Sequence, residues 1–217
     1  MTIVARTLAD RVFEIVRERV VSGDLPGNSA IRQDALAAEL GVSKIPLREA
    51  LARLEQEGLL SSQANRGYSV RPMSAGQADE IYALRLSIEP AAAAHGAEMA
   101  DANGQGELLD AFRALEEAAA ANLSDVGVRS RDFHIAMVRP SGRHLTTQLV
   151  ERLGILSERY VVAHVNAARS GARRHDGRQG LVDAWLARDG GKVQTLLHDH
   201  IEGTLTDLRA GFSATQG

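Results

Sequence analysis

The chain has 217 residues, of which 44% are hydrophobic and 24% are charged, a balance that is ordinary for a soluble globular protein. Because it contains no cysteine, it can form neither disulfides nor Cys-based metal sites. Charged side chains interrupt the first twenty residues, unlike a signal peptide, and no apolar run approaches the length of a membrane span. We therefore expect a cytoplasmic protein with one large domain or two small ones.

The net charge of −3 argues neither for nor against a nucleic-acid partner. Residues 1–72 contain ten Lys and Arg against nine Asp and Glu, which leaves +1 for that part of the chain. Any contact with DNA must therefore come from the placement of a few basic side chains rather than from bulk charge. Aromatic residues make up only 4% and Ala and Leu dominate, which favours helices over sheets.

Three helices are predicted in the first 58 residues. Apolar residues recur at helical spacing through 7–22, and the turn "SGDLPG" ends that segment. "RQDALAAEL" predicts a second, short helix that ends at Gly41. Ser43 is placed to cap a third helix, with Pro46 in its first turn, where proline is tolerated. Positions i, i+3, i+4 and i+7 predict the buried face of the third helix, formed by Leu47, Ala50, Leu51 and Leu54.

A β-hairpin is predicted directly after these helices. The segment "LLSSQANRGYSVRP" (59–72) alternates in polarity and carries Asn65-Arg66-Gly67 at its centre, which is a tight-turn signal. Three helices followed by a small hairpin form a winged helix-turn-helix. Pro72 and the residues after it indicate a linker.

The remainder of the chain is helical by pattern. Six amphipathic segments follow from about Asp79, separated by Gly, Asn, Ser or Pro, and they predict an all-α helical bundle. The fold is therefore expected to be mainly α. We divide the chain into a winged helix-turn-helix domain (1–72), a linker (73–78), an all-helical domain (79–211) and a frayed tail (212–217).

The third helix has the features of a DNA-recognition helix. Such a helix lies in the major groove with its N-terminal residues against base edges, and the buried face leaves Lys44 and Arg48 one turn apart on the outside. By itself an exposed Lys/Arg pair is more often a solvated surface, so the prediction depends on the hairpin and the whole pattern. Including the helix starts and the hairpin tip, the predicted DNA contacts are Arg32, Gln33, Ser43, Lys44, Arg48, Arg66 and Gly67.

Leu25–Val70 resembles the DNA-binding domain of the GntR family of bacterial transcription regulators. The resemblance includes the Pro-Gly turn, "LGVS", "PLREAL" and the "EGL" that directly follows the third helix. The family usually has Arg where this chain has Lys44, which keeps the charge but loses a two-pronged donor. The segments "YALRLSIEP" (82–90), "RDFHIAMVRPSG" (131–142) and "DAWLARDGGKVQTLLHDHI" (183–201) resemble the FCD effector domain of the family's FadR branch. Together the two resemblances cover nearly the whole chain.

The FCD resemblance raises the question of a metal ion, because many of these domains hold a divalent metal with one Asp and three His. The matching positions here are Ser130, His134, Arg178 and His200, so two of the four ligands are replaced. Asp132 cannot stand in for Ser130, because a two-residue offset on a helix points away from His134. His175 lies one turn from Arg178, which leaves open a metal held by His134, His200 and His175.

Our hypothesis is that Arg178 takes over the role of the metal and binds a carboxylate effector through two parallel hydrogen bonds. His134 and His200 would then line the pocket and hydrogen-bond to the effector, and Ser130 would donate a hydrogen bond to it. The alternative is that Arg178 is a surface residue and that the two histidines are core residues whose hydrogen bonds are made within the protein. Arg85 is a second candidate for effector binding, although an ion pair with Glu89 at i, i+4 explains it as well.

The resemblance implies a ligand-responsive, sequence-specific transcription regulator and no enzymatic activity. It implies a homodimer on a pseudo-palindromic DNA operator, acting as a repressor that a small carboxylate metabolite releases. One alternative is a metal-dependent helical-bundle enzyme, but no nucleophile and base can be paired in the sequence. The other is a sequence-blind DNA-binding protein, which would show a steep salt dependence that so few basic residues do not favour.

Overall fold

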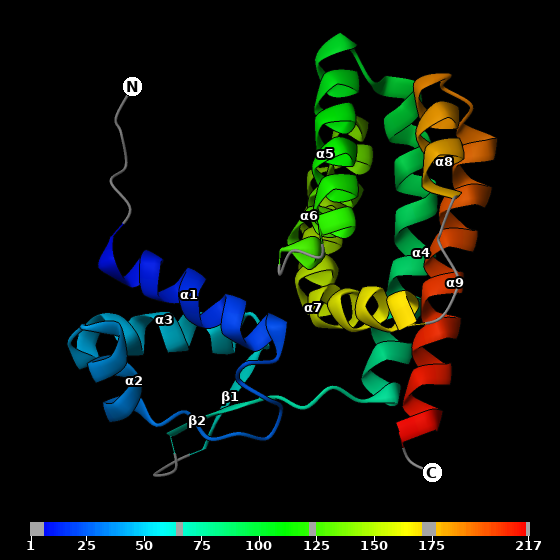
Figure 1. Ribbon diagram of the computed structural model, residues 1–217. Helices are drawn as coiled ribbons and strands as arrows, with labels where there is room; N and C mark the ends of the chain where they lie inside the picture. The colour runs from blue at the N-terminus through cyan, green and yellow to red at the C-terminus, as the bar shows by residue number, and fades with distance from the viewer. Residues whose placement is uncertain (1–6, 64–66, 122–124, 171–176, 216–217) are drawn as a thin grey trace. The chain divides into compact units, whose positions relative to one another are not determined.

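The computed structural model describes residues 7–63, 67–121, 125–170 and 177–215. The chain divides into two compact units, residues 1–73 and 74–217. Helices dominate both units, and the sheet in the described part of the chain is a two-stranded hairpin (Figure 1). The predicted mainly α fold is therefore confirmed.

The first unit is a winged helix-turn-helix. Helix α1 packs along α3, and α2 and the hairpin also contact α3. All four residues predicted for the buried face of α3 are 0% exposed. They share one hydrophobic core with apolar residues of α1, α2 and the hairpin. The elements are α1 (Leu8–Ser22), α2 (Gln33–Leu40), α3 (Lys44–Gln56), β1 (Leu60–Gln63) and β2 (Gly67–Val70).

Local side-chain chemistry sets the helix boundaries of this unit. The Asp10 backbone N–H donates to the Thr7 hydroxyl at 3.1 Å and the Thr7 N–H donates to the Asp10 carboxylate at 2.9 Å, which is a capping box at the start of α1. Helices α1 and α2 end at Gly23 and Gly41, whose φ angles of 93° and 65° suit glycine. Ser43 occupies the N-cap position of α3, but its hydroxyl makes no capping hydrogen bond within the described part of the chain.

The hairpin is tied to the segment that leads into α2. Strands β1 and β2 are antiparallel, with Leu60 opposite Val70. The backbone N–H of Ile31 donates to the Tyr68 carbonyl at 2.8 Å, and that of Asn28 donates to the Val70 carbonyl at 2.9 Å. These bonds fix β2 against the start of α2. Of the predicted turn, Asn65 and Arg66 lie outside the described residues.

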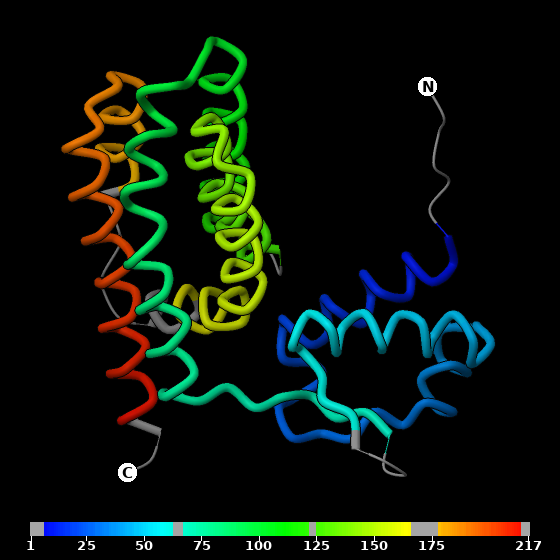
Figure 2. Tube along the Cα trace, turned by 180° about the vertical axis from the view of Figure 1, so that it is seen from behind, coloured from blue at the N-terminus to red at the C-terminus, as the bar shows by residue number. Residues whose placement is uncertain are grey.

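The second unit is a helical bundle. Figures 1 and 2 show α4 and α9 side by side along most of their length, and beside them α6 packs against both α5 and α7. Helix α8 packs on α9 and contacts α4 and α5. The helices are α4 (Ala75–Met99), α5 (Ala102–Ala121), α6 (Val126–Val138), α7 (His144–Ser170), α8 (Gly177–Leu186) and α9 (Gly190–Thr215), with a short 3-10 helix η1 (Arg139–Ser141).

Three helices meet closely at Met137. A Cβ atom added at Gly96 on α4 would collide with the Met137 carbonyl on α6, so only glycine allows this approach. The fully buried Trp185 on α8 donates its Nε1 hydrogen to the same carbonyl at 3.2 Å. This contact fixes α8, which carries Arg178, against α4 and α6.

Two element boundaries differ from the sequence-based expectation. Helix α4 begins at Ala75, inside the segment 73–78 expected to be a linker, because the Ser74 hydroxyl caps it by accepting the Gln77 N–H at 3.2 Å. Helix α9 continues to Thr215, into the tail 212–217 that was expected to fray. None of the helices in the described ranges is both long enough and apolar enough to cross a bilayer.

Candidate functional site

The outward face of α3 carries two of the predicted DNA contacts. Burial of the opposite face leaves Lys44 and Arg48 exposed. Lys44 Nζ lies 2.6 Å from Asp34 Oδ1, and Arg48 Nε donates to Gln33 Oε1 at 3.3 Å. Ion pairs and hydrogen bonds between exposed side chains are weak, so a phosphate or a base edge can replace these partners.

Gln33 lies where α2, α3 and the wing meet. Its Nε2 atom is 3.3 Å from the position of a Cβ atom at Gly67, whose φ angle is 76°. A side chain at Gly67 would therefore strain the backbone and press on Gln33. Arg32, at the N-cap position of α2, is exposed, and so is Ser43. Arg66, the predicted tip of the wing, lies outside the described residues.

The bundle contains a cavity with about 480 Å³ of space, part of it open to solvent. Each α-helix described in the second unit contributes at least one lining residue. Apolar side chains, among them Leu115 and Ile201, form part of the wall. The polar lining residues are Tyr82, Arg85, Ser130, His134, His164, Arg178, His200 and Thr204. All five predicted effector-binding residues therefore line this one cavity.

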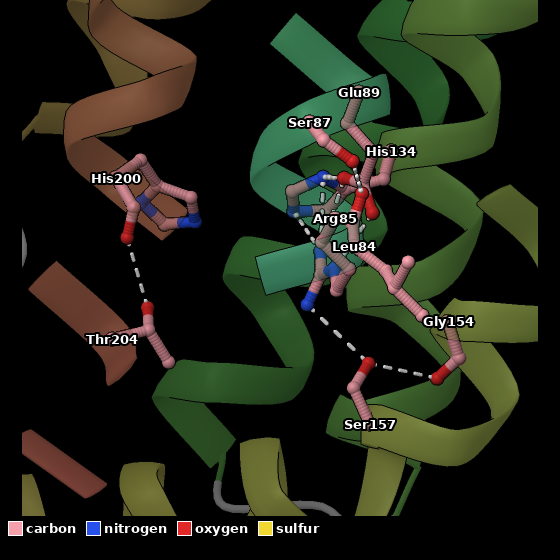
Figure 3. Close-up of polar contacts among 9 residues, drawn as sticks. All are labelled: Leu84, Arg85, Ser87, Glu89, His134, Gly154, Ser157, His200 and Thr204. Carbon is pink, nitrogen blue, oxygen red and sulfur yellow. Dashed lines mark hydrogen bonds and ion pairs between the residues drawn. The ribbon is translucent and has the colours of Figure 1, made fainter. Parts of the chain in front are cut away.

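Two of the lining residues, Arg85 and His134, belong to a buried charge cluster (Figure 3). Arg85 Nε and Nη2 donate to the two carboxylate oxygens of Glu89 at 2.6 and 3.2 Å, so the i, i+4 pair considered from sequence is present. Arg85 Nη1 donates to the Ser157 hydroxyl at 3.3 Å. His134 Nδ1 lies 2.7 Å from Glu89 Oε2. Figure 3 shows Arg85, Glu89 and His134 pointing toward one another, with His200 on α9 apart from them.

The protonation states of this cluster follow from its burial and its charges. Burial opposes ionisation of Glu89, but the Arg85 charge and the His134 side chain outweigh it and lower the Glu89 pKa to about 2. Burial lowers the pKa of His134, although the Glu89 carboxylate acts against that shift. Burial also acts to lower the pKa of Arg85, but the Glu89 charge outweighs it and raises that pKa. Glu89 is therefore an ionised acceptor, and neutral His134 donates its Nδ1 hydrogen to it.

Arg178 has a different environment from Arg85. Its Nη1 atom donates to Glu116 Oε1 at 2.6 Å, and this partner on α5 is 51% exposed while the Arg178 side chain is 17% exposed. The Arg85 charge is balanced inside the protein, whereas the Arg178 charge is balanced by a carboxylate in contact with water. Arg178 is therefore the cation that an entering anion can reach with less competition.

The cavity does not fit the four-ligand metal set of the FCD domain. Arg85 Nη2 lies 3.2 Å from Nδ1 and 3.4 Å from Nε2 of His134, which places a positive charge beside the ring nitrogens that would bind a cation. The His134 and His200 ring centroids are 5.8 Å apart. Neither Ser130 nor Arg178 is of the ligand type expected at its position.

Among the described residues, the cavity also contains no group of three His, Asp or Glu side chains close enough to share a metal ion. The group of three His, Asp or Glu side chains close enough to share an ion is exposed and lies outside the cavity lining; it consists of His198, Asp199 and Glu202. His175, which the sequence suggested as a third ligand, lies outside the described residues. The described lining residues therefore do not fit a divalent metal.

The structure gives three residues a role at the cavity that the sequence did not assign to them. Tyr82 is 0% exposed, as a core residue would be, and it also lines the cavity. Its hydroxyl makes no hydrogen bond of good geometry to the residues that the structure describes. Burial raises its pKa to about 12, and the Arg85 guanidinium, 5.2 Å from the ring centroid, acts against that shift. His164 gave no signal in the sequence, because its place in the wall depends on how α7 packs. Glu89 was considered only as a partner of Arg85, and its contact with His134 could not be read from spacing.

Comparison with known proteins agrees with both units. The family described as bacterial regulatory proteins, gntR family, matches residues 8–70, and the FCD domain matches residues 80–203. The HTH-type transcriptional regulator BphR of Paraburkholderia xenovorans is 27% identical over 94% of this chain and 86% of its own length. The HTH-type transcriptional repressor GlaR of Escherichia coli is 29% identical over 87% of this chain and 90% of its own.

A solved structure supports the fold. The Escherichia coli protein McbR/YncC superposes with a TM-score of 0.75 at 21% identity, covering 95% of this chain and 99% of that one. The relatives are transcription regulators rather than enzymes, so the enzyme alternative is not supported. The chain belongs to the gntR family of bacterial regulatory proteins, in the branch with a C-terminal FCD domain, and is a ligand-responsive DNA-binding transcription regulator.

Proposed function

We propose that a homodimer of this regulator represses transcription from a pseudo-palindromic operator, and that a small carboxylate metabolite bound in the bundle cavity releases it from DNA. The observation that carries the proposal is the convergence of five polar side chains from four helices on one cavity: Arg85, Ser130, His134, Arg178 and His200. A partly apolar cavity with a few convergent polar groups is the usual form of a small-molecule site.

Arg178 is the group that selects a carboxylate. Its partner Glu116 is half exposed, so a ligand carboxylate can displace it and accept two parallel hydrogen bonds from the guanidinium. Arg85, held by Glu89, contributes a polar wall rather than a free charge. His134 and His200 supply ring nitrogens beside this position, and Ser130 supplies a hydroxyl.

On the DNA side, α3 enters the major groove. Lys44 and Arg48 reach base edges or phosphates, and Ser43 with the first N–H groups of α3 binds a phosphate. The start of α2, with Arg32 and Gln33, and the wing, with Arg66 and Gly67, contact the flanking backbone. Such a regulator acts on the chromosome, which supports a cytoplasmic location.

Reading two half-sites requires two recognition helices and therefore a dimer. Exposed leucines on α4 and α7, two helices that pack together, support a contact between subunits there: Leu84 (45% exposed), Leu145 (71%) and Leu149 (45%). An effector that favours the DNA-free arrangement shifts operator affinity by about 1–3 kcal/mol. The description of GlaR as a repressor supports repression as the sign of control.

The test combines thermal melting with DNA binding. Wild type is melted against a panel of small carboxylic acids, and any acid that raises the melting temperature is added to the protein bound to a duplex enriched from a randomised library. We expect one acid to stabilise the protein and to release the duplex. Arg178→Ala should bind the duplex but lose both responses, whereas Arg113→Ala, a change at an exposed arginine outside the cavity lining, should keep them. Unchanged acid affinity in Arg178→Ala would overturn the assignment of the carboxylate to this residue.

A further inference from the structure

Ile45 is the second residue of α3, and its side chain is 70% exposed. It stands between Lys44 and Pro46, in the first turn of the helix that also presents Arg48. A single exposed apolar side chain is ordinary on a protein surface and needs no explanation by itself. Ile45, however, lies at the N-terminal end of α3, the part of a recognition helix that contacts base edges.

The helix geometry directs Ile45 away from the protein. Each residue of an α-helix turns by about 100°, so Ile45 lies about 200° from Leu47. Leu47 is 0% exposed and belongs to the buried face of α3 together with Leu51. Ile45 therefore projects from the side opposite the core, on the same outward stripe as Arg48 and Glu49, which follow it at i+3 and i+4.

The apolar side chain of Ile45 restricts which groups on a base edge it can recognise. Ile45 neither donates nor accepts a hydrogen bond, so it cannot recognise the polar edges that suit Lys44 and Arg48. Among the base pairs of the major groove, A·T carries an apolar group on its edge, the 5-methyl of thymine, and apolar side chains contact it. Burying that methyl against an isoleucine removes apolar surface of both partners from water.

We infer that Ile45 is a specificity-determining residue that reads thymine through its 5-methyl group, next to the base or phosphate contacts of Lys44 and Arg48. The inference rests on the assignment of α3 to the major groove. Because each buried methyl contributes about 0.8 kcal/mol, loss of one methyl in a single half-site should weaken binding about fourfold, and loss of one methyl in each of the two half-sites about fifteenfold.

The experiment uses the full chain and chemically altered DNA. A randomised duplex library is enriched on the wild-type protein, and the enriched duplex is resynthesised with deoxyuridine in place of thymidine at one position at a time. Deoxyuridine keeps every hydrogen-bonding group of thymine and lacks only the methyl. Affinities for each duplex are then measured with wild type, Ile45→Val, Ile45→Ser and Ile15→Ser, the last being the same change at an exposed isoleucine of α1.

We expect one thymine in each half-site at which deoxyuridine weakens wild-type binding about fourfold, with the same penalty in Ile15→Ser, a smaller one in Ile45→Val and none in Ile45→Ser. The inference is overturned if no thymine shows a methyl effect, or if Ile45→Ser retains it. Failure of the library to enrich any sequence would overturn the inference as well, but it would also remove the sequence-specific assignment of α3, so the two failures are distinguishable. Equal melting temperatures of the variants establish that they are folded.

Discussion

His134, which lines the cavity, donates its Nδ1 hydrogen to Glu89 Oε2 across 2.7 Å, and this contact joins α6 to α4. Both side chains are buried, and the same carboxylate also receives two hydrogen bonds from Arg85. The cation, the carboxylate and the imidazole therefore depend on one another. Removing one partner leaves the others buried without compensation.

Glu89→Gln should destabilise the protein strongly. The substitution removes the negative charge while Arg85 stays buried, and breaking a buried pair in this way costs about 3–5 kcal/mol in the free energy of unfolding. Urea unfolding measures this change. The control is Asp110→Asn, which breaks an exposed pair with Arg113 and should cost less than about 1 kcal/mol. Similar small losses in both variants would show that the cluster contributes little to stability.

The cluster should also make the fold sensitive to acid. The pKa of His134 lies below its ordinary 6.5, so its contribution to stability is present above pH 6.5 and is lost as the pH falls below that value. The pKa of Glu89 is about 2 against an ordinary 4.5, so its contribution is lost as the pH falls from about 4.5 toward 2. His134→Asn keeps an N–H donor but cannot titrate. Between pH 7 and 5 the free energy of unfolding should therefore fall less in this variant than in wild type, and equal slopes would contradict the argument.

Much of the fold could be predicted because local signals agreed with one another. The apolar spacing of α3, the glycine after α2 and the polar alternation of the hairpin each indicated the same winged helix-turn-helix. The boundary of α4 was harder to predict, because one serine hydroxyl decided it. Ser74 caps a helix that begins at Ala75, four residues before Asp79, where the apolar pattern began to favour a helix.

The cavity was less predictable, because it is made by packing. Resemblance to a family placed Ser130, His134, Arg178 and His200 together, and the structure brings them to one cavity. Spacing along a helix could indicate the pairing of Arg85 with Glu89, since it is an i, i+4 contact. It could not indicate that the same carboxylate meets a histidine 45 positions later in the chain.

Tyr82→Phe should separate effector binding from stability. The Tyr82 hydroxyl is buried beside the cavity without a described hydrogen-bond partner, so removing it should leave the free energy of unfolding unchanged or raise it. If a ligand oxygen accepts that hydroxyl, the variant should bind the effector several-fold more weakly. Thermal melts with and without the stabilising acid measure both quantities. Equal effector affinity, or a large loss of stability without ligand, would show that the hydroxyl is satisfied within the protein.

Metal removal should leave the regulator unchanged. With Ser130 and Arg178 at two ligand positions and a guanidinium 3.4 Å from His134 Nε2, the described residues provide no divalent site in the cavity. Protein purified without a His-tag should therefore contain no stoichiometric metal, and a chelator should change neither its melting temperature nor its DNA affinity. The double variant Ser130→Asp, Arg178→His restores the ligand types of the family and should gain a zinc-dependent stabilisation that a chelator reverses. Stoichiometric metal in the wild-type protein would instead mean that His134 and His200 still recruit an ion, with His175 as the remaining candidate ligand, and Arg178 would not be the metal's replacement.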